Sequence, residues 1–265
     1  MEKQFIELCK IGNLDDIPKL IATQYVNINS TNEEGFIWAC RNGHLHIVEY
    51  LINLHNINPN YDKINIHVHD EYGFTWACLN GHLHIVEYLI NLYKIRQSRN
   101  TDYKIIDVNA NDERCFRWAC ENGHIHVVEY LTNLHKINTD YAKINIHVNN
   151  ESGFRCACIN GHLHIVEYLT NLYKINTNYV KINIHANDEE GFVQACENGH
   201  LHIVKYLISL YKIRHNRNTD YKIINIHANY NEGFVLTHYY GYNYVIKYVV
   251  SIGIYVPNHE CIVFL

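Results

Sequence analysis

Proline is scarce in this chain. Its 265 residues include three prolines and 13 glycines, which excludes collagen-like sequence and proline-rich linkers. Charged residues make up only 18% of the sequence, too few for a disordered acidic or basic chain. The formal net charge is −5, which argues against broad nucleic-acid binding because such binding depends on clustered positive charge. With 48% hydrophobic residues, the composition predicts a soluble protein with a buried core.

Long apolar runs are also missing. The first ten residues carry charges and lack the apolar core of a signal peptide. The most apolar stretch near the end, residues 245–256, is interrupted by Lys247 and Gly253 and is too short to span a bilayer. We therefore expect a protein that stays inside the cell, in the cytoplasm, and is neither secreted nor bound to a membrane.

The sequence does contain a repeat. The dipeptide Gly-Phe begins at residues 35, 73, 153, 191 and 233, with a degenerate Cys115-Phe116 between the second and third copies, so the steps are 38 or 42 residues. The triplet Asn-Gly-His begins at residues 42, 80, 122, 160 and 198. Less regular units at both ends bring the count to seven, as expected of a stack whose end units have one uncovered face. The predicted domain is one continuous array over 1–265, with a cap repeat at 1–34, central repeats at 35–72, 73–114, 115–152, 153–190 and 191–232, and a second cap at 233–265.

Each repeat predicts two helices and an arm. A short helix is expected over residues 36–42, ended by Gly43, because glycine readily adopts the left-handed conformation of a helix cap. Residues 44–54 place apolar side chains at helical spacing, which predicts a second helix. Residues 64–68 alternate apolar and polar side chains, which predicts a short extended arm. Such a unit cannot bury its apolar face alone, so the repeats are expected to stack.

The repeat resembles a known family. Residues 39–51, Ala-Cys-Arg-Asn-Gly-His-Leu-His-Ile-Val-Glu-Tyr-Leu, resemble the ankyrin repeat's Ala-Ala-x-x-Gly-His-x-x-Ile-Val-x-x-Leu, and residues 64–68 look like its hairpin. The resemblance covers nearly the whole chain. It implies an all-α, ankyrin-like α-solenoid of about seven helix-turn-helix repeats with short β-hairpin or extended arms. The richness in asparagine, isoleucine and tyrosine resembles the ankyrin-repeat proteins of giant DNA viruses of the mimivirus type.

Three features depart from the family's pattern. Its Thr-Pro-Leu-His opening is replaced by Glu-Gly-Phe-Ile at residues 34–37. Its period of 33 residues is lengthened by an insertion after the second helix. The glycine that usually ends the second helix is missing from the middle repeats, so this helix is expected to run on into the connector. The longest connectors carry the basic clusters of the chain, at residues 94–104 and 212–222, and we interpret them as solvated loops.

Twenty histidines raise the question of a metal site. They recur in pairs such as His44 and His46, a spacing that puts two rings on opposite sides of a helix. Equivalent residues of packed helices lie on the order of 10 Å apart, too far for tetrahedral coordination at about 2 Å. We therefore expect His44 and its counterparts to bond loop backbone, and His46 and its counterparts to face solvent or a neighbouring repeat. No metal and no cofactor are expected; a histidine-rich metal-binding protein is the alternative.

The cysteines and the motif search predict no catalysis. One cysteine per repeat occupies the same core position, at Cys9, Cys40, Cys78, Cys120, Cys158 and Cys196. A buried cysteine behaves as a small hydrophobic residue, and the repeat spacing exceeds the reach of a disulfide. Cys115, Cys156 and Cys261 lie outside this series and have no base at a fixed spacing. Because phosphate-binding, zinc-protease and hydrolase motifs are also missing, we predict no catalytic residue, no enzyme activity and no small-molecule substrate.

The tryptophans mark a candidate surface. The residue before the Ala-Cys pair, which by resemblance lines the concave face of ankyrin arrays, is Trp38, Trp76 and Trp118 in three consecutive repeats and then Cys156, Gln194 and Leu236. Tryptophan is enriched at interface hot spots, so a binding stripe is one interpretation, and packing of the indoles as core is the other. The position of Arg41, Leu79 and Glu121 varies alongside. The candidate partner-binding residues are Trp38, Trp76, Trp118, Arg41, Leu79 and Glu121.

These observations predict a binding function. We expect a monomeric, non-catalytic scaffold for protein–protein interaction that binds through its concave helix face and hairpin tips. The partner is a protein, not a nucleic acid, a membrane or a small molecule. Resemblance to giant-virus proteins implies a host or viral partner met in the host cytoplasm. The alternative is a structural, self-associating repeat protein without a discrete partner.

Overall fold

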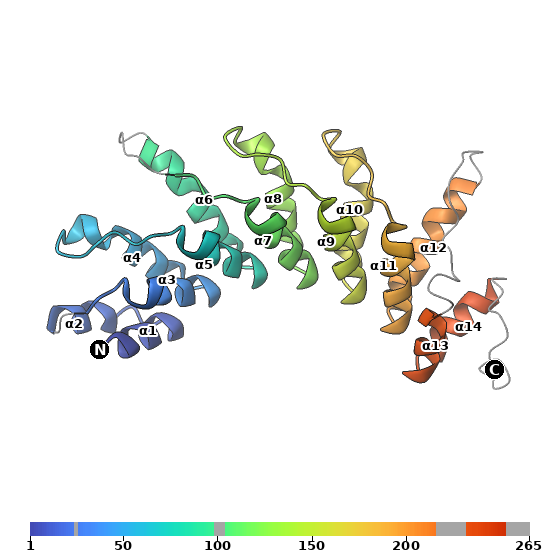
Figure 1. Ribbon diagram of the computed structural model, residues 1–265, viewed down its shortest axis with the longest axis horizontal. Helices are drawn as coiled ribbons and strands as arrows, with labels where there is room; N and C mark the ends of the chain where they lie inside the picture. Colours follow the sequence, from blue (N-terminus) through green and yellow to red (C-terminus); the bar gives the residue numbers. More distant parts are fainter. Residues whose placement is uncertain (24–25, 98–103, 216–231, 253–265) are drawn as a thin grey trace. The chain divides into compact units, whose positions relative to one another are not determined.

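All regular structure in the described part of the chain is α-helical. The computed structural model describes residues 1–23, 26–97, 104–215 and 232–252, without the side chains at 93–97, 211–215 and 232–235. Over these ranges it contains fourteen helices and no strand (Figure 1). The helices are α1 (Glu2–Ile11), α2 (Asp16–Thr23), α3 (Ser30–Arg41), α4 (Leu45–Ile57), α5 (Val68–Leu79), α6 (Leu83–Gln97), α7 (Ala110–Glu121), α8 (Ile125–Ile137), α9 (Val148–Ile159), α10 (Leu163–Ile175), α11 (Ala186–Glu197), α12 (Leu201–His215), α13 (Glu232–Tyr239) and α14 (Asn243–Ser251). The predicted all-α class is confirmed.

The chain divides into two compact units. The first unit comprises residues 1–119 and 126–145, and the second comprises residues 120–125 and 146–265. Within each unit the helices form consecutive pairs, and the first helix of a pair packs on the first helix of the next: α1 on α3 and α3 on α5 in the first unit, α9 on α11 and α11 on α13 in the second (Figure 1). The division into seven repeats with the bounds given above stays a prediction. Most of the two basic connectors lies outside the described residues.

The apolar side chains of each helix pair form the core. In the five central pairs, α3 to α12, each first helix contributes a phenylalanine and an Ala-Cys pair, and each second helix contributes branched aliphatic side chains at helical spacing. The fully buried phenylalanines are Phe5, Phe36, Phe74, Phe116, Phe154 and Phe192. Burying one such side chain contributes roughly 1.5–3 kcal/mol. In α4, Ile47, Val48 and Leu51 are buried while Glu49 and Asn53 are exposed, so the predicted apolar face is confirmed.

Two recurring glycines are required by close packing. Gly43 ends the first helix with a φ of 81°, and a Cβ there would meet the ring of His82 at 2.8 Å. Gly73 lies against Phe36, whose ring carbon would be 2.6 Å from an added Cβ. The glycines of the Gly-Phe and Asn-Gly-His motifs therefore recur because consecutive repeats pack too closely at these positions for a Cβ atom.

The expected hairpin arms take another form in the described residues. Residues 62–65 run without regular pairing, and the chain then enters α5 through a left-handed turn at His69, Asp70 and Glu71, with φ between 50° and 66°. The same turn opens α3, α7, α9 and α11. A left-handed conformation costs roughly 1–2 kcal/mol per residue, least for Asn and Asp because their side chains bond locally. Asparagine and aspartate accordingly fill most of these positions.

A buried glutamate is the last residue of each turn and bonds to the next repeat. Glu71 is 2% exposed, and its carboxylate accepts hydrogen bonds from His67 Nδ1 at 2.8 Å and from the backbone N–H of Asp107 at 3.1 Å. Equivalent bonds join the carboxylates of Glu33, Glu113 and Glu151 to the N–H groups of Asn65, Asn145 and Asn183. These glutamates were not predicted from the sequence. They could have been found there, because a glutamate lies two residues before every Gly-Phe of the central repeats and before Cys115-Phe116.

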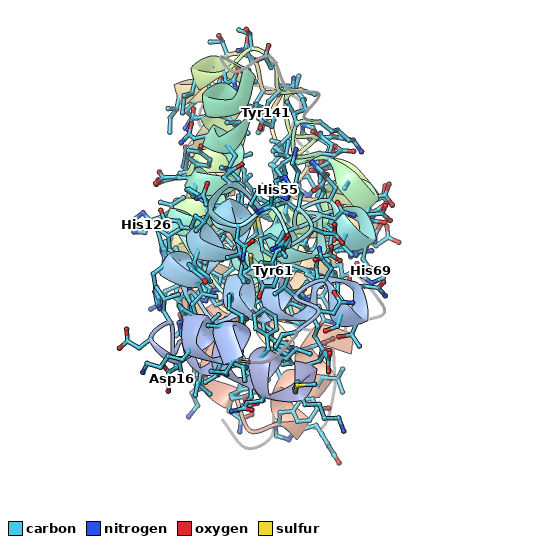
Figure 2. All side chains as sticks on the ribbon, turned by 90° about the vertical axis from the view of Figure 1, so that its left-hand side faces the viewer. Asp16, His55, Tyr61, His69, His126 and Tyr141 are labelled. Carbon is cyan, nitrogen blue, oxygen red and sulfur yellow. The ribbon has the colours of Figure 1, made fainter. Side chains whose placement is uncertain are left out.

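The connectors fold back onto the preceding repeat. In α4 the second helix runs beyond residue 54 to Ile57, and in the next repeat α6 runs to Gln97. Both helices continue into the connector, which confirms the expected extension. In the last turn of α4, His55 Nδ1 lies 2.7 Å from the carbonyl oxygen of Tyr61, and the Tyr61 hydroxyl donates to the carbonyl of Ile21 at 3.0 Å. Figure 2 labels His55 and Tyr61. Tyr141 makes the corresponding bond to Ile90 at 3.3 Å. Within the described residues, the structure has no helix with the length and apolar character to cross a membrane.

Candidate partner-binding surface

The three tryptophans lie at equivalent places on successive first helices of the first unit. Trp38 is on α3, Trp76 on α5 and Trp118 on α7, and each directly precedes a fully buried alanine. All three indoles are half-buried. They are therefore neither fully buried core residues nor freely exposed side chains.

Cations lie over the first two indoles. The Arg41 guanidinium carbon is 4.7 Å from the ring centroid of Trp38 and 3.9 Å from that of Trp76. The ammonium of Lys10, at the end of α1, is 5.0 Å from the Trp38 centroid. A cation over an aromatic face is attracted by the ring quadrupole, by about 0.5–1 kcal/mol at exposed sites and about 2 kcal/mol where water is excluded. The arginine thereby joins the tryptophans of two consecutive repeats.

The series continues into the third repeat. The ring centroids of Trp76 and Trp118 are 6.1 Å apart at an interplanar angle of 51°, and Tyr72 meets Trp76 edge-on at 5.8 Å. The Arg114 guanidinium carbon lies 5.5 Å from the Trp118 centroid. We call Trp38, Arg41, Trp76 and Trp118 the tryptophan–arginine stack.

The remaining predicted site residues end neighbouring helices. Leu79 is half-buried at the end of α5. Glu121 is exposed at the end of α7 and belongs to the second unit, where its carbonyl oxygen lies 3.0 Å from His162 Nε2. Of the three variable residues, Arg41 lies over two of the tryptophan rings. Lys10, Tyr72 and Arg114 were not predicted, because nothing in the one-dimensional sequence shows that they lie beside the indoles.

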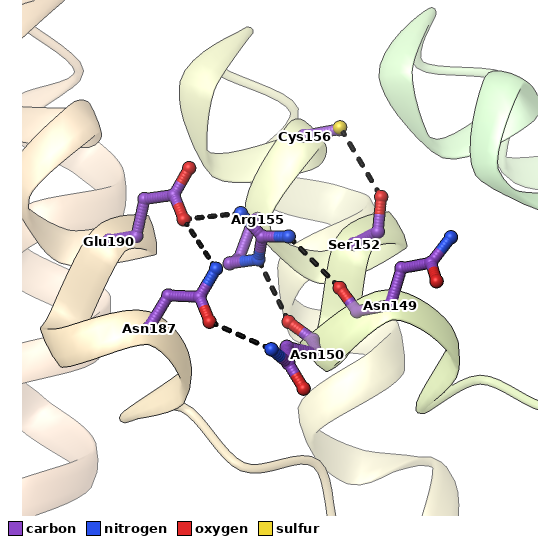
Figure 3. A network of polar contacts seen from close by, with 7 residues as sticks. All are labelled: Asn149, Asn150, Ser152, Arg155, Cys156, Asn187 and Glu190. Carbon is purple, nitrogen blue, oxygen red and sulfur yellow. Dashed lines mark hydrogen bonds and ion pairs between the residues drawn. The ribbon is translucent and has the colours of Figure 1, made fainter.

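The second unit has a different chemistry at the same positions. Cys156, Gln194 and Leu236 replace the tryptophans there and are also half-buried. Beside Cys156, Arg155 donates from Nε to the carbonyl of Asn150 at 2.8 Å and from Nη2 to that of Asn149 at 3.0 Å, and it pairs with the Glu190 carboxylate (Figure 3). All three nitrogens of its guanidinium thus donate to oxygens of its own unit.

Further polar contacts extend this network. The side-chain amide of Asn187 donates to Glu190 at 3.0 Å, and that of Asn150 donates to the Asn187 side-chain oxygen at 3.0 Å (Figure 3). These side chains join the left-handed turns of α9 and α11. The second unit therefore uses this region for bonds between repeats.

The histidine pairs also join consecutive repeats. Nε2 of His44 lies 3.0 Å from the carbonyl oxygen of Lys10, and Nε2 of His46 lies 3.1 Å from that of Gly12. The same contacts recur for His82 with Arg41, His84 with Gly43, His162 with Glu121, His164 with Gly123, His200 with Ile159 and His202 with Gly161. Backbone bonding by His44 and its counterparts is confirmed. The prediction that paired rings lie on opposite sides of a helix is wrong, since the His44 and His46 centroids are 5.9 Å apart: His44 precedes α4, which begins at Leu45.

Partial burial disfavours the charged form of these imidazole rings. It lowers the pKa of His162 and of His200 below their ordinary value of 6.5. Each Nε2 faces a carbonyl oxygen, which can only accept, so the Nε2–H donates and the neutral ring satisfies the contact. Within the described part of the chain, no three or more His, Cys, Asp or Glu residues gather closely enough to hold a metal ion.

The cysteine series belongs to the core, as predicted. Cys40 and Cys158 are fully buried, and burial raises the pKa of both thiols well above the ordinary value. Burial likewise raises the pKa of Cys9 to about 12. A raised pKa disfavours the reactive thiolate. Cys115 replaces the glycine of its repeat and donates from Sγ to the carbonyl of Val108 at 2.9 Å, while Cys261 lies outside the described residues.

The chain is similar to several known proteins. A family model of ankyrin repeats in three copies matches residues 5–101 and 76–181. A 54-residue stretch is 37% identical to acyl-CoA-binding domain-containing protein 6 of Rattus norvegicus, and the match spans 19% of this chain and 19% of that protein. The X-ray structure of an ankyrin repeat family protein from Legionella pneumophila aligns over 97% of this chain and 72% of its own, with 19% identity and a TM-score of 0.39. Because the family model spans more than half of the sequence, the chain belongs to the ankyrin-repeat family.

Proposed function

We propose that this chain is a non-catalytic binding protein whose first unit holds a partner protein through the tryptophan–arginine stack. One observation carries the proposal: three half-buried indoles and a guanidinium lie in contact across three consecutive repeats. Tryptophan and arginine are the residue types most enriched at interface hot spots. Ankyrin repeats generally mediate protein–protein interaction, which supports the same conclusion.

The stack suits this role because it is ordered before a partner arrives. The indoles and the guanidinium constrain one another through ring contacts at 3.9–6.1 Å. Binding to an ordered surface avoids much of the entropy cost of immobilising side chains, about 0.5–1.5 kcal/mol for each one. The backbone carbonyl of Arg41 also accepts from His82 of the next repeat, which fixes the base of the arginine.

Neighbouring residues extend the proposed surface. Leu79 stands at the end of α5 and supplies an apolar contact to the partner. Glu121, at the end of α7, belongs to the second unit and is proposed as an acidic contact of that unit. The left-handed turns take the place that the hairpin tips have in the sequence-based expectation, and their outer residues are exposed at Thr31, Asn32, His69, Asp70, Asn111 and Asp112. We propose that these turns form the second contact region, along an edge of the concave helix face.

The composition supports a class of partner. Richness in asparagine, isoleucine and tyrosine is the feature shared with giant-virus ankyrin proteins, and on that ground the partner is a host or viral protein met in the cytoplasm. The chain acts as a monomer and needs no metal or cofactor.

The test compares capture of partners by matched variants. Wild-type protein and Trp76→Leu, which keeps an apolar side chain, are used as baits in host-cell extract, and the captured proteins are quantified by mass spectrometry. The proposal predicts that a discrete partner is lost from Trp76→Leu and, after purification, binds the wild type directly in titration calorimetry. The double variant Tyr239→Ser/Tyr240→Ser alters exposed aromatics of the second unit and serves as the control. Equal capture by wild type and Trp76→Leu contradicts the proposal.

A second candidate function, self-association, is favoured by the last described helices. In and between α13 and α14, Tyr239, Tyr240, Tyr244 and Val250 are 79%, 58%, 46% and 42% exposed. An uncovered apolar face of a repeat can stack on another copy. Sedimentation velocity over a wide range of concentrations tests this candidate: growth of the sedimentation coefficient that Tyr239→Ser/Tyr240→Ser abolishes supports it, and a constant monomer rejects it.

A further inference from the structure

Arg41 is held in an unusual setting for an arginine. Its guanidinium carbon lies over the rings of Trp38 and Trp76, at 4.7 and 3.9 Å from their centroids. A guanidinium is planar, with all five N–H donors directed outward in its plane. Two indole rings thus lie close to this group, and its N–H donors are the part that can still pair with an acceptor.

The edge of this guanidinium has no acceptor within the described residues. The Arg41 side chain makes no hydrogen bond or ion pair within the described residues, whereas two other arginines donate to oxygens of their own unit. Arg117 donates to the carbonyls of Asp112 and Asn111 at 2.7 and 3.2 Å. Arg155 donates to two carbonyls and pairs with a carboxylate. Arg41 is therefore positioned by its neighbours without being neutralised by them.

We propose that Arg41 receives a carboxylate from an acidic segment of the partner protein. This inference rests on the proposed function and specifies the chemistry that its surface recognises. An ordered guanidinium edge matches the two oxygens of a carboxylate in a bidentate pair. Lys10 beside Trp38 and Arg114 beside Trp118 place further cations along the same series of rings. The surface thus alternates indole faces with positive charges.

This alternation fits an acidic protein segment better than a nucleic acid. The chain carries a net charge of −5, and carboxylates stand among the cations of the surface: Glu7 lies 3.7 Å from Lys10, and Glu34 accepts from Trp38 Nε1 at 3.2 Å. These carboxylates repel a continuous polyanion. Single Asp or Glu side chains separated by apolar residues can pair with Arg41 and still cover the indoles.

The test selects peptides from a random 12-residue library displayed on phage, using the full chain as bait. Parallel selections use wild type, Arg41→Gln, Arg41→Glu and Trp76→Leu. Wild type is expected to enrich peptides with Asp or Glu beside apolar residues. A synthetic peptide of the consensus should bind Arg41→Gln about 10- to 100-fold more weakly, the range for a lost hydrogen-bonded charge, and Arg41→Glu should lose the acidic preference. Lys205→Gln is the matched control, because Lys205 also lies over an aromatic ring, that of Tyr248 at 5.0 Å, but in the second unit.

Each outcome separates this inference from the function on which it rests. Peptides that depend on Trp76 but bind Arg41→Gln as well as wild type overturn the acidic inference and leave the binding surface standing. Selected peptides without enrichment of Asp or Glu also overturn the acidic inference and leave the binding surface standing. Failure to select any peptide that depends on Trp76 or Arg41 contradicts both. Preference for phosphoserine over glutamate in the synthetic peptide assigns the site to phosphate and overturns the carboxylate. Circular dichroism and thermal melting confirm that each variant is folded.

Discussion

At the scale of single residues, a buried glutamate bonds one repeat to the next. A buried carboxylate is costly unless hydrogen bonds replace its water. Glu71 receives them from His67 and from the N–H of Asp107, so the carboxylate satisfies a backbone donor of the following repeat while keeping its own turn in place. This structural glutamate thus recurs with the same steps of 38 or 42 residues as the Gly-Phe dipeptide.

Glu71→Ala is expected to destabilise the first unit by about 1–3 kcal/mol, because the Asp107 N–H is left without an acceptor. Glu71→Gln keeps one acceptor oxygen and should lose less. The measurement is the midpoint of urea unfolding followed by circular dichroism. Glu49→Ala, at an exposed position of α4, is the control and should stay within about 0.5 kcal/mol of wild type. Equal midpoints for Glu71→Ala and Glu49→Ala rule out the hydrogen-bonded role.

At the scale of elements, the entry to each first helix is the least expected feature. Alternation over residues 64–68 predicted an extended or hairpin arm, yet the chain makes three consecutive left-handed residues before the helix continues. Alternation reports that every second side chain is buried, as Ile64, Ile66 and Val68 are. It does not report whether a partner strand exists. The bonds of Glu71 to the next repeat supply the order that strand pairing gives a hairpin.

Thr31→Gly is expected to stabilise the protein. Thr31 is exposed with a φ of 51°, a strained conformation for a β-branched residue. Glycine removes that cost of roughly 1–2 kcal/mol but adds about 0.5–1 kcal/mol of unfolded-state entropy, so the net gain is of order 0.5–1 kcal/mol. Urea unfolding measures it. Glu49→Gly, in regular helix, should instead lose about 1 kcal/mol; a loss of the same size for Thr31→Gly shows that the turn is not strained.

The histidine contacts make the second unit sensitive to acid. Burial holds the pKa of His162 and His200 below 6.5, so the unfolded chain takes up protons at these residues before the folded chain does. Their contribution to stability is therefore complete above about pH 6.5 and declines as the pH falls through that value toward the folded pKa.

The corresponding measurement is the urea midpoint as a function of pH. It should fall as the pH is lowered below about 6.5, and the fall should be shallower in the double variant His162→Gln/His200→Gln, whose side chains cannot take up the protons. His164→Gln and His202→Gln, at exposed positions, serve as controls. An unchanged slope in the double variant shows that other groups cause the acid sensitivity.

At the scale of the whole molecule, sequence predicts the repeated core better than the surface. The Gly-Phe, Ala-Cys and Asn-Gly-His signals recur because the same packing recurs: Gly73 admits the Phe36 ring, and Gly43 admits the His82 ring. The tryptophan positions could be found in the same way. The participation of Lys10, Tyr72 and Arg114 could not, because contacts made once in a chain leave no periodic trace.

The two units differ in chemistry at positions that the repeat makes equivalent. In the first unit the Arg41 guanidinium lies over two indoles, and in the second unit Arg155 donates to Asn149 and Asn150 and pairs with Glu190. A repeated core thus supports two distinct surfaces. We infer that partner recognition is concentrated in the first unit.

The most direct test of the central claim is the intrinsic fluorescence of the folded protein. All three tryptophans of the chain belong to the stack, so the emission reports on that surface alone. The structure predicts an emission maximum and an acrylamide quenching constant between those of free tryptophan and of a core indole. It also predicts that a bound partner, or the selected acidic peptide, protects the indoles from acrylamide. Blue-shifted emission that acrylamide does not quench, with no change on adding either ligand, would place the indoles in the core and contradict the proposed surface.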